Sequence, residues 1–146
     1  MRAVIDTNVW VSGLLWRGAP WRILRLAERG EIEVCIAPPM LTELEEVLSA
    51  ERFRPRLEHL GFSPSDLVAY ALHLSTVFEV PESPKSDRSP IVAADPDDDV
   101  FVLCAEVSGA SYLVSGDRHL LDMVQYQEIA ILSPAEFLER AFPKEG

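Results

Sequence analysis

Two short apolar runs of the sequence end in an aspartate, and both aspartates are candidate metal ligands. Asp6 follows the run that ends at Ile5, and Asp117 follows the run at 112–115 after a single glycine. A third acidic segment, Asp95–Asp99, lies between them in the chain. If the apolar runs are neighbouring parallel strands, their carboxyl ends meet at one edge of a sheet. The carboxylates would gather there, and this predicts a bound hard cation.

A fourth acid reaches the same edge from a predicted helix. In the helix expected from Met40 to about Ala50, Met40 and Leu44 belong to the inward stripe. Glu43 is three residues after Met40 and lies on the rim of that stripe. The neighbouring Glu45 and Glu46 are expected further round, toward solvent. Glu43 is therefore the acid of this helix expected to face the site.

The acidic segment allows two interpretations. Acids at a helix N-terminus are stabilised by the helix dipole by roughly 0.3–1 kcal/mol each, so the segment could simply begin the helix predicted from Val100. Four acids in five residues exceed that need. Each acid taken alone favours a structural role, whereas acids arriving from four segments together favour a metal site.

The electrostatics of gathered carboxylates indicate which chemistry to expect. Two carboxylates ~5 Å apart repel each other by about 3 kcal/mol at an effective dielectric near 20, so protons or a divalent cation must compensate. Oxygen ligands without grouped Cys or His favour Mg²⁺ or Mn²⁺ over zinc. Such an ion can polarise a phosphoryl oxygen and lower the pKa of a water molecule, which suits phosphodiester hydrolysis. The sequence holds no Gly-x-Ser-x-Gly turn, so a serine hydrolase is not indicated.

Strands alternating with helices must position these acids. The pattern predicts an α/β fold in three layers, α/β/α, with a central parallel sheet of about five strands and a single domain over 1–146. The expected strands are Ala3–Ile5, Ile32–Ala37, Thr76–Val80, Tyr112–Ser115 and Ile129–Leu132. The expected helices are Trp10–Leu15, 20–29, Met40–Ala50, 64–74, Val100–Val107 and 134–141, the fourth with Ser63 as N-cap and the last with a capping box at Ser133. The proline-rich segment 81–90 is expected to be a mobile surface loop that could gate the site.

Composition sets further bounds. The 146 residues carry a formal net charge of −11, which argues against nucleic acid unless several acids are neutralised by metal. The two cysteines lie in apolar runs and are expected to be buried free thiols. No apolar stretch approaches the ~20 residues that span a bilayer, so we expect a cytoplasmic protein without membrane contact.

Basic and aromatic residues offer candidates for RNA contacts. Arg52, Arg54 and Arg56 lie within five residues and are the better candidates for phosphate contacts, although a solvated surface is the simpler explanation of the cluster. Trp10, Trp16 and Trp21 could stack on bases, but their apolar neighbours favour core or dimer contacts.

The acidic motifs resemble those of the PIN domain family, the metal-dependent ribonucleases that include VapC-type toxins of bacterial toxin–antitoxin pairs. Asp6-Thr7-Asn8-Val9 is similar to the opening motif of the family, and Glu43 in Leu41–Leu44 to its second acid. Asp95–Asp99 resembles the third-acid segment of a subgroup described as toxin components, and Ser115-Gly116-Asp117 the motif of the fourth acid. The similarity runs from Val4 to about Leu132.

This resemblance implies roles for individual residues. The catalytic acids and metal ligands would be Asp6, Glu43, Asp98 and Asp117, with Asp99 as an additional ligand. Asp98 is preferred to Asp99 on the family's spacing to Ala105, whereas physical reasoning alone leaves the two open. Asn8 and Ser115 would hydrogen-bond the ligands or the substrate phosphate. His119 stands where many relatives carry an aspartate, so no role follows there.

The resemblance also implies partners: an RNA substrate, Mg²⁺ or Mn²⁺, a cognate antitoxin and a second copy in a homodimer. The leading hypothesis is a metal-dependent endoribonuclease, and the alternative is a catalytically silent PIN module that binds RNA or a protein partner. A phosphoryl receiver domain would need a lysine after the last strand to pair with the phosphoryl group, but the only lysines are Lys85, in the loop, and Lys144, at the tail. A haloacid-dehalogenase-like phosphatase would need an aspartate at the position of Asn8.

Overall fold

The computed structural model describes residues 1–81 and 99–143. Within these residues, six strands form one sheet in the order β3-β2-β1-β4-β6-β5. The strands are β1 (Arg2–Ile5), β2 (Glu33–Ile36), β3 (Ser75–Val77), β4 (Tyr112–Val114), β5 (Gln125–Tyr126) and β6 (Ile129–Leu132). All neighbours pair in parallel except β5, which pairs antiparallel with β6. The predicted five parallel strands are confirmed, and β5 adds an edge strand that was not predicted.

The strand β1 lies in the middle of the sheet, between β2 and β4. Its residues Ala3–Ile5 are fully buried, and Val4 pairs with Cys35 on one side and Leu113 on the other. A continuous apolar run without polar alternation is typical of a strand covered on both faces. The residue that follows such a strand is delivered to the middle of the carboxyl edge of the sheet.

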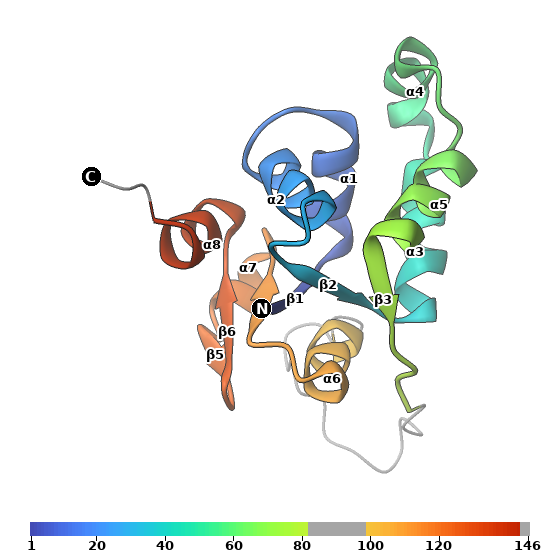
Figure 1. Ribbon diagram of the computed structural model, residues 1–146. Helices are drawn as coiled ribbons and strands as arrows, with labels where there is room; N and C mark the ends of the chain where they lie inside the picture. Colours follow the sequence, from blue (N-terminus) through green and yellow to red (C-terminus); the bar gives the residue numbers. More distant parts are fainter. Residues whose placement is uncertain (82–98, 144–146) are drawn as a thin grey trace.

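Helices cover both faces of the sheet, which confirms the three-layer α/β/α prediction. Figure 1 shows α1 and α2 on one face and α6, which contacts β1, β2 and β4, on the other. The helix α8 packs against β6 and α2, and α3 packs against α1, α5 and α6. The helices are α1 (Thr7–Leu15), α2 (Ala19–Glu28), α3 (Pro38–Leu48), the 3₁₀ helix η1 (Glu51–Phe53), α4 (Arg54–Leu60), α5 (Pro64–Leu74), α6 (Asp99–Ser108), α7 (Arg118–Leu121) and α8 (Pro134–Ala141).

Two helices begin at the serines that the sequence indicated. Ser63 and Ser133 each accept a hydrogen bond from the backbone N–H three residues later, at Asp66 and Glu136. The carboxylate of each of those acids accepts in return from the N–H of the serine, so both helices carry a complete capping box. A proline occupies the first helical position of each, where its missing N–H is not needed.

The segment between α3 and α5 differs most from the sequence-based expectation, which assigned no element there. It folds into η1 and α4, and Phe53, Leu57 and Leu60 pack against the core at helical spacing. The helix ends at Gly61, whose left-handed φ of 78° favours glycine. Because α4 is only seven residues long, its apolar stripe is too short to stand out in the sequence.

Smaller differences concern element boundaries. The helix α1 begins at Thr7 rather than Trp10, because Asp6 is its N-cap. The strand β3 ends at Val77, three residues before the predicted end. The short α7 and β5 were not predicted. Val124 and Gln127, on either side of β5, have a positive φ, which is uncommon for residues other than glycine.

The two cysteines are free and buried, Cys35 in β2 and Cys104 in α6, as predicted. Burial in apolar surroundings raises the pKa of both thiols, that of Cys104 to about 12. None of the helices in the described part of the chain is long and apolar enough to span a membrane.

Candidate active site

Asp6 lies at the carboxyl end of β1 and begins α1. Its side chain is 4% exposed, and its Oδ1 accepts a hydrogen bond of 2.9 Å from the N–H of Val9. The backbone N–H of Asp6 donates to the carbonyl of Val114 at the end of β4. The carboxylate is therefore held by the first turn of α1, and the backbone of Asp6 is held by the neighbouring strand.

Ser115 connects Asp6 to the segment that carries Asp117. Its side chain is fully buried directly after β4, and its hydroxyl donates a hydrogen bond to Oδ2 of Asp6. The hydroxyl oxygen of Ser115 also accepts a hydrogen bond of 2.9 Å from the backbone N–H of Asp117. The hydroxyl of Ser115 therefore joins the segment after β1 to the segment after β4.

Asp117 is the N-cap of the short helix α7. Its Oδ1 accepts a hydrogen bond of 2.7 Å from the N–H of His119, and its side chain is 30% exposed. The imidazole Nδ1 of His119 lies 3.7 Å from the same oxygen. The side chain of Asp117 is thus partly open to solvent.

Glu43 reaches the site from α3 through a hydroxyl that the sequence analysis did not single out. The side chain of Thr7 is buried beside Asp6, and its Oγ1 donates a hydrogen bond of 2.8 Å to Oε2 of Glu43. Glu43 itself is exposed, at the rim where it was expected. Thr7 follows Asp6 and is the first residue of α1, and this position was the signal in the sequence that could have indicated a role at the site.

Burial determines the electrostatics of Asp6. Desolvation raises the pKa of the Asp6 carboxyl above its ordinary value, and the negative charge of Asp117 raises it further. Hydrogen bonds from Ser115 and from the backbone N–H groups of Val9 and Gly116 oppose this rise in pKa. A buried carboxylate beside a second acid is a position where a bound cation would be favourable.

The remaining predicted ligands are not brought into this cluster by the described residues. Asp98, together with Asp95 and Asp97 and the segment 82–90, lies outside them, so its role stays a prediction. Asp99 is the first residue of α6, half-buried and engaged in other interactions, and Asn8 is exposed in the first turn of α1. Within residues 1–81 and 99–143, no three His, Cys, Asp or Glu side chains come close enough together to hold a metal ion.

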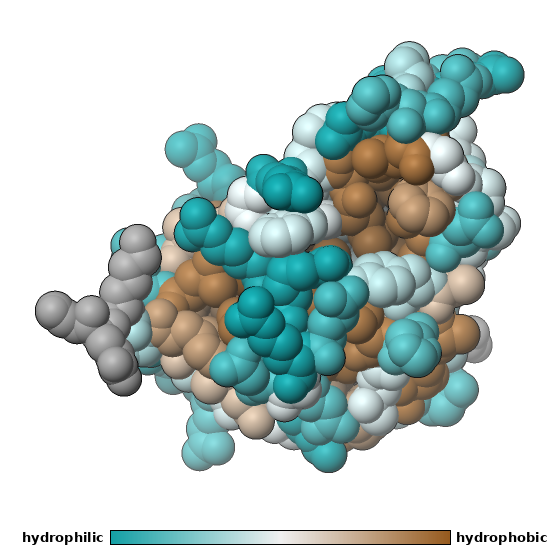
Figure 2. All heavy atoms as spheres, turned by 45° about the horizontal axis from the view of Figure 1, so that its top comes forward, coloured by the Kyte–Doolittle hydropathy of each residue, from teal (hydrophilic) through white to brown (hydrophobic). Residues whose placement is uncertain are grey.

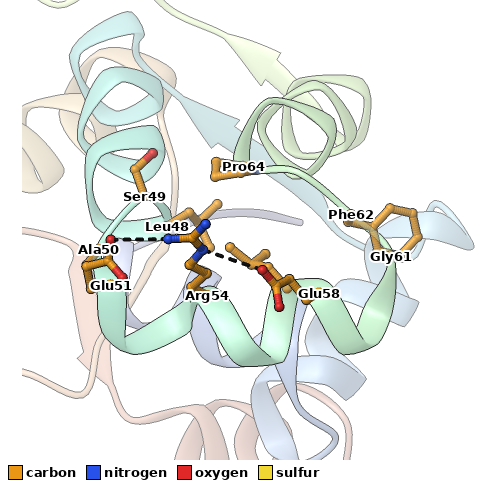
Figure 3. A pocket seen from close by; sticks show the side chains of 10 residues that line it. Leu48, Ser49, Ala50, Glu51, Arg54, Glu58, Gly61, Phe62 and Pro64 are labelled. Atoms are coloured by element: carbon orange, nitrogen blue, oxygen red, sulfur yellow. Dashed lines mark ion pairs between the residues drawn. The ribbon is translucent and has the colours of Figure 1, made fainter.

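The three arginines predicted for phosphate contacts have protein partners of their own. Arg54 lies 3.7 Å from Glu51 and 3.4 Å from Glu58, beside a hollow of about 410 Å³ (Figure 3). Arg56 donates from Nε to the carbonyl of Leu15 at 2.7 Å. The guanidinium of Arg52 stacks 4.6 Å from the ring centroid of Phe53. Each of the three arginines thus has a partner within the protein.

Comparisons with known proteins identify the family and the fold. The sequence matches the PIN domain family over residues 2–119. A solved structure with the same fold is the crystal structure of PAE2754 from Pyrobaculum aerophilum, with a TM-score of 0.62 and 19% identity over 97% of this chain and 90% of that one. No curated protein matches the sequence. Because the family match covers most of the chain and includes the segments of Asp6, Glu43 and Asp117, the chain belongs to the PIN domain family.

Proposed function

We propose that this protein is a metal-dependent endoribonuclease and acts as the toxin of a toxin–antitoxin pair. PIN domains are generally nucleases, and the observation that carries the proposal is the bridge made by Ser115. One buried hydroxyl binds the carboxylate of Asp6 and orders the backbone of Asp117, so two acids from separate strands are held at one edge of the sheet.

The chemistry of the donor set fits Mg²⁺ or Mn²⁺. Asp6 and Asp117 supply carboxylate oxygens, Glu43 adds a third through its bond to Thr7, and Asp98 or Asp99 is proposed as the fourth. Hard divalent cations prefer such all-oxygen sites. When bound, the ion would polarise the scissile phosphate and activate water for its hydrolysis.

Each residue contributes a distinct task in this proposal. The N–H of Val9 and the hydroxyl of Ser115 fix both oxygens of Asp6, so its carboxylate is oriented before the ion arrives. Thr7 restricts the longer side chain of Glu43 in the same way. Asp117 faces solvent, where a phosphodiester can approach.

A catalytically silent PIN module that binds RNA or a protein is the second candidate. It is favoured by the raised pKa of Asp6, since a proton can compensate a buried carboxyl in place of a cation. The two candidates differ in whether a divalent ion binds.

Metal binding and RNA cleavage test the proposal together. Asp6→Asn, Asp117→Asn and Glu43→Gln should each abolish or strongly reduce RNA cleavage with Mn²⁺ or Mg²⁺, and chelator should do the same to the wild type. Glu45→Gln, on the exposed side of α3, is the matched control and should cleave normally. Calorimetry with Mn²⁺ should show binding to the wild type and loss of binding in Asp6→Asn. Undiminished cleavage by Asp6→Asn would refute the nuclease assignment, and a wild type that neither binds Mn²⁺ nor cleaves RNA would favour the silent module.

The toxin role and the homodimer need separate tests. Expression of the wild type in bacteria should arrest growth, and Asp6→Asn should relieve the arrest. Normal growth with abundant wild-type protein would remove the toxin label and leave the nuclease chemistry untouched. Sedimentation of the purified protein should give twice the mass of one chain.

A further inference from the structure

Aromatic rings and guanidinium groups form a continuous strip at the end of α1 remote from Asp6. Trp16 lies 6.1 Å from Phe53 between ring centroids, and the guanidinium of Arg56 lies 5.8 Å from the centroid of Trp16. The guanidinium of Arg52 lies 4.6 Å from the ring centroid of Phe53. Each of these two rings therefore carries a guanidinium group over one face.

The strip continues onto α2 through the residue after Trp16. Arg17 lies 5.2 Å from the ring centroid of Trp21, and Arg25 lies 5.1 Å from the same centroid. We define the aromatic–arginine strip by these members: Trp16, Arg17, Trp21, Arg25, Arg52, Phe53 and Arg56. The same ring of Trp21 and the guanidinium of Arg25 also line a hollow of about 310 Å³ between α1, α2 and α5.

The strip is accessible and positively charged in an acidic protein. Trp16 is 45% exposed, and Arg17 and Arg52 are also exposed. The chain has a net charge of −11 but places seven of its 13 basic residues between positions 17 and 56: Arg17, Arg22, Arg25, Arg29, Arg52, Arg54 and Arg56. In Figure 2, which brings the top of Figure 1 forward, hydrophilic side chains run over α2 between two apolar areas.

We propose that the aromatic–arginine strip binds single-stranded RNA, with a base stacked on Trp16 and phosphates beside Arg17 and Arg52. Stacking rings combined with cations are the usual equipment for unpaired nucleic acid, because every base has a face and every linkage a negative charge. The proposal rests on the proposed ribonuclease function and identifies the substrate as unpaired RNA. It differs from the expectation for Arg54, whose charge is already shared with Glu51 and Glu58.

The position of the strip suits an RNA substrate that extends several nucleotides beyond the scissile phosphodiester. The helix α1 begins at Asp6 and its nine residues end at Leu15, so the strip lies about 13 Å along the helix axis from the acids. A strand held there would pass its next nucleotides toward the carboxyl edge of the sheet. Bases on the strip would contribute affinity without touching the metal ligands.

Binding measured in chelator separates this proposal from catalysis. Fluorescence anisotropy of an end-labelled single-stranded RNA of about 12 nucleotides reports its affinity for the full-length protein. Trp16→Ala should weaken binding by about 5- to 150-fold, the range for loss of one stacked base, and Trp16→Phe should retain most of the affinity. Arg17→Ala should weaken binding and reduce the salt slope by roughly 0.7. Arg140→Ala, at an exposed position of α8, is the matched control and should bind as the wild type does.

Several results would overturn the proposal. Equal affinity of the wild type, Trp16→Ala and Arg17→Ala would remove the strip from RNA binding, and so would failure of the wild type to bind. Equal affinity for a duplex of the same length would exclude stacking. Displacement of the RNA by poly-glutamate as effectively as by unlabelled RNA would indicate a docking surface for an acidic protein instead.

Failure of the nuclease function would look different. A wild type that binds RNA through Trp16 but does not cleave it with Mn²⁺ would support the strip and refute the catalytic proposal. Circular dichroism of each variant confirms folding, and Arg17→Ala, whose side chain is exposed, carries the test if Trp16→Ala does not fold.

Discussion

Replacing Ser115 by alanine tests the central feature of the site, the hydroxyl between Asp6 and Asp117. The substitution keeps the Cβ of a fully buried residue and removes only the oxygen. Two hydrogen bonds disappear with it, the one donated to Oδ2 of Asp6 and the one accepted from the N–H of Asp117.

The expected loss of stability follows from these two bonds. A hydrogen bond to a charged group contributes about 1.5–3 kcal/mol and a neutral one about 0.5–1.5 kcal/mol, so Ser115→Ala should lower the free energy of unfolding by roughly 2–4 kcal/mol. That is a large part of the typical 5–15 kcal/mol of a folded domain. For a chain of this length the midpoint of thermal unfolding should fall by roughly 5–15 °C.

Urea unfolding in chelator at neutral pH, followed by tryptophan fluorescence, measures this loss. Ser111→Ala, at an exposed position before β4, is the control and should change the free energy of unfolding little. Because Ser115 lowers the pKa of Asp6, carboxyl NMR should show a higher pKa for Asp6 in Ser115→Ala. In a double-mutant cycle, Ser115→Ala should lower the free energy of unfolding by less in the Asp6→Asn background than in the wild type. A loss below about 1 kcal/mol, or a pKa of Asp6 that does not rise, would contradict the role assigned to Ser115.

Three further changes have defined outcomes. Because the pKa of Asp6 is raised in the folded protein, the stability of the wild type relative to Asp6→Asn should be highest at low pH and fall from about pH 4 upward as the carboxyl ionises; a flat difference in urea titrations would contradict this. Thr7→Val should weaken Mn²⁺ binding by roughly 10–100-fold in calorimetry because Glu43 loses its hydrogen bond, and unchanged affinity would exclude that support. Gly13→Ala places a Cβ 2.9 Å from Cδ1 of Leu24, so thermal unfolding should show a loss of about 1–3 kcal/mol; unchanged stability would show that α1 and α2 separate easily.

The parallel sheet could be predicted from local patterns. The continuous apolar runs at β1 and β4 mark strands buried on both faces, and such runs need no knowledge of their neighbours. The capping boxes at Ser63 and Ser133 are equally local, since each spans only four residues. Asp6 and Asp117 could be assigned to one edge because both directly follow parallel strands.

The elements that were missed are short or depend on the surrounding structure. The two-residue strand β5 exists because β6 offers it an edge, and α4 exists because the core accepts its few apolar side chains. Their patterns are too brief to stand out in the chain. The same limit applies to the third acid, which the sequence could place only in a segment and not at a single residue.

The sequence by itself determined the layers of the fold and the types of residue at the edge of the sheet. This was possible because the hydrophobic periodicity of a strand or helix depends only on residues that are close together in the chain. Only the tertiary structure decided how these residues act on one another. The bond between Thr7 and Glu43 joins residues 36 positions apart, and that between Ser115 and Asp6 joins residues 109 apart. Packing of α1 against α4 likewise brings Trp16, which caps α1, to Phe53, which caps α4. Such contacts depend on how whole elements pack, and no local pattern in the chain specifies that.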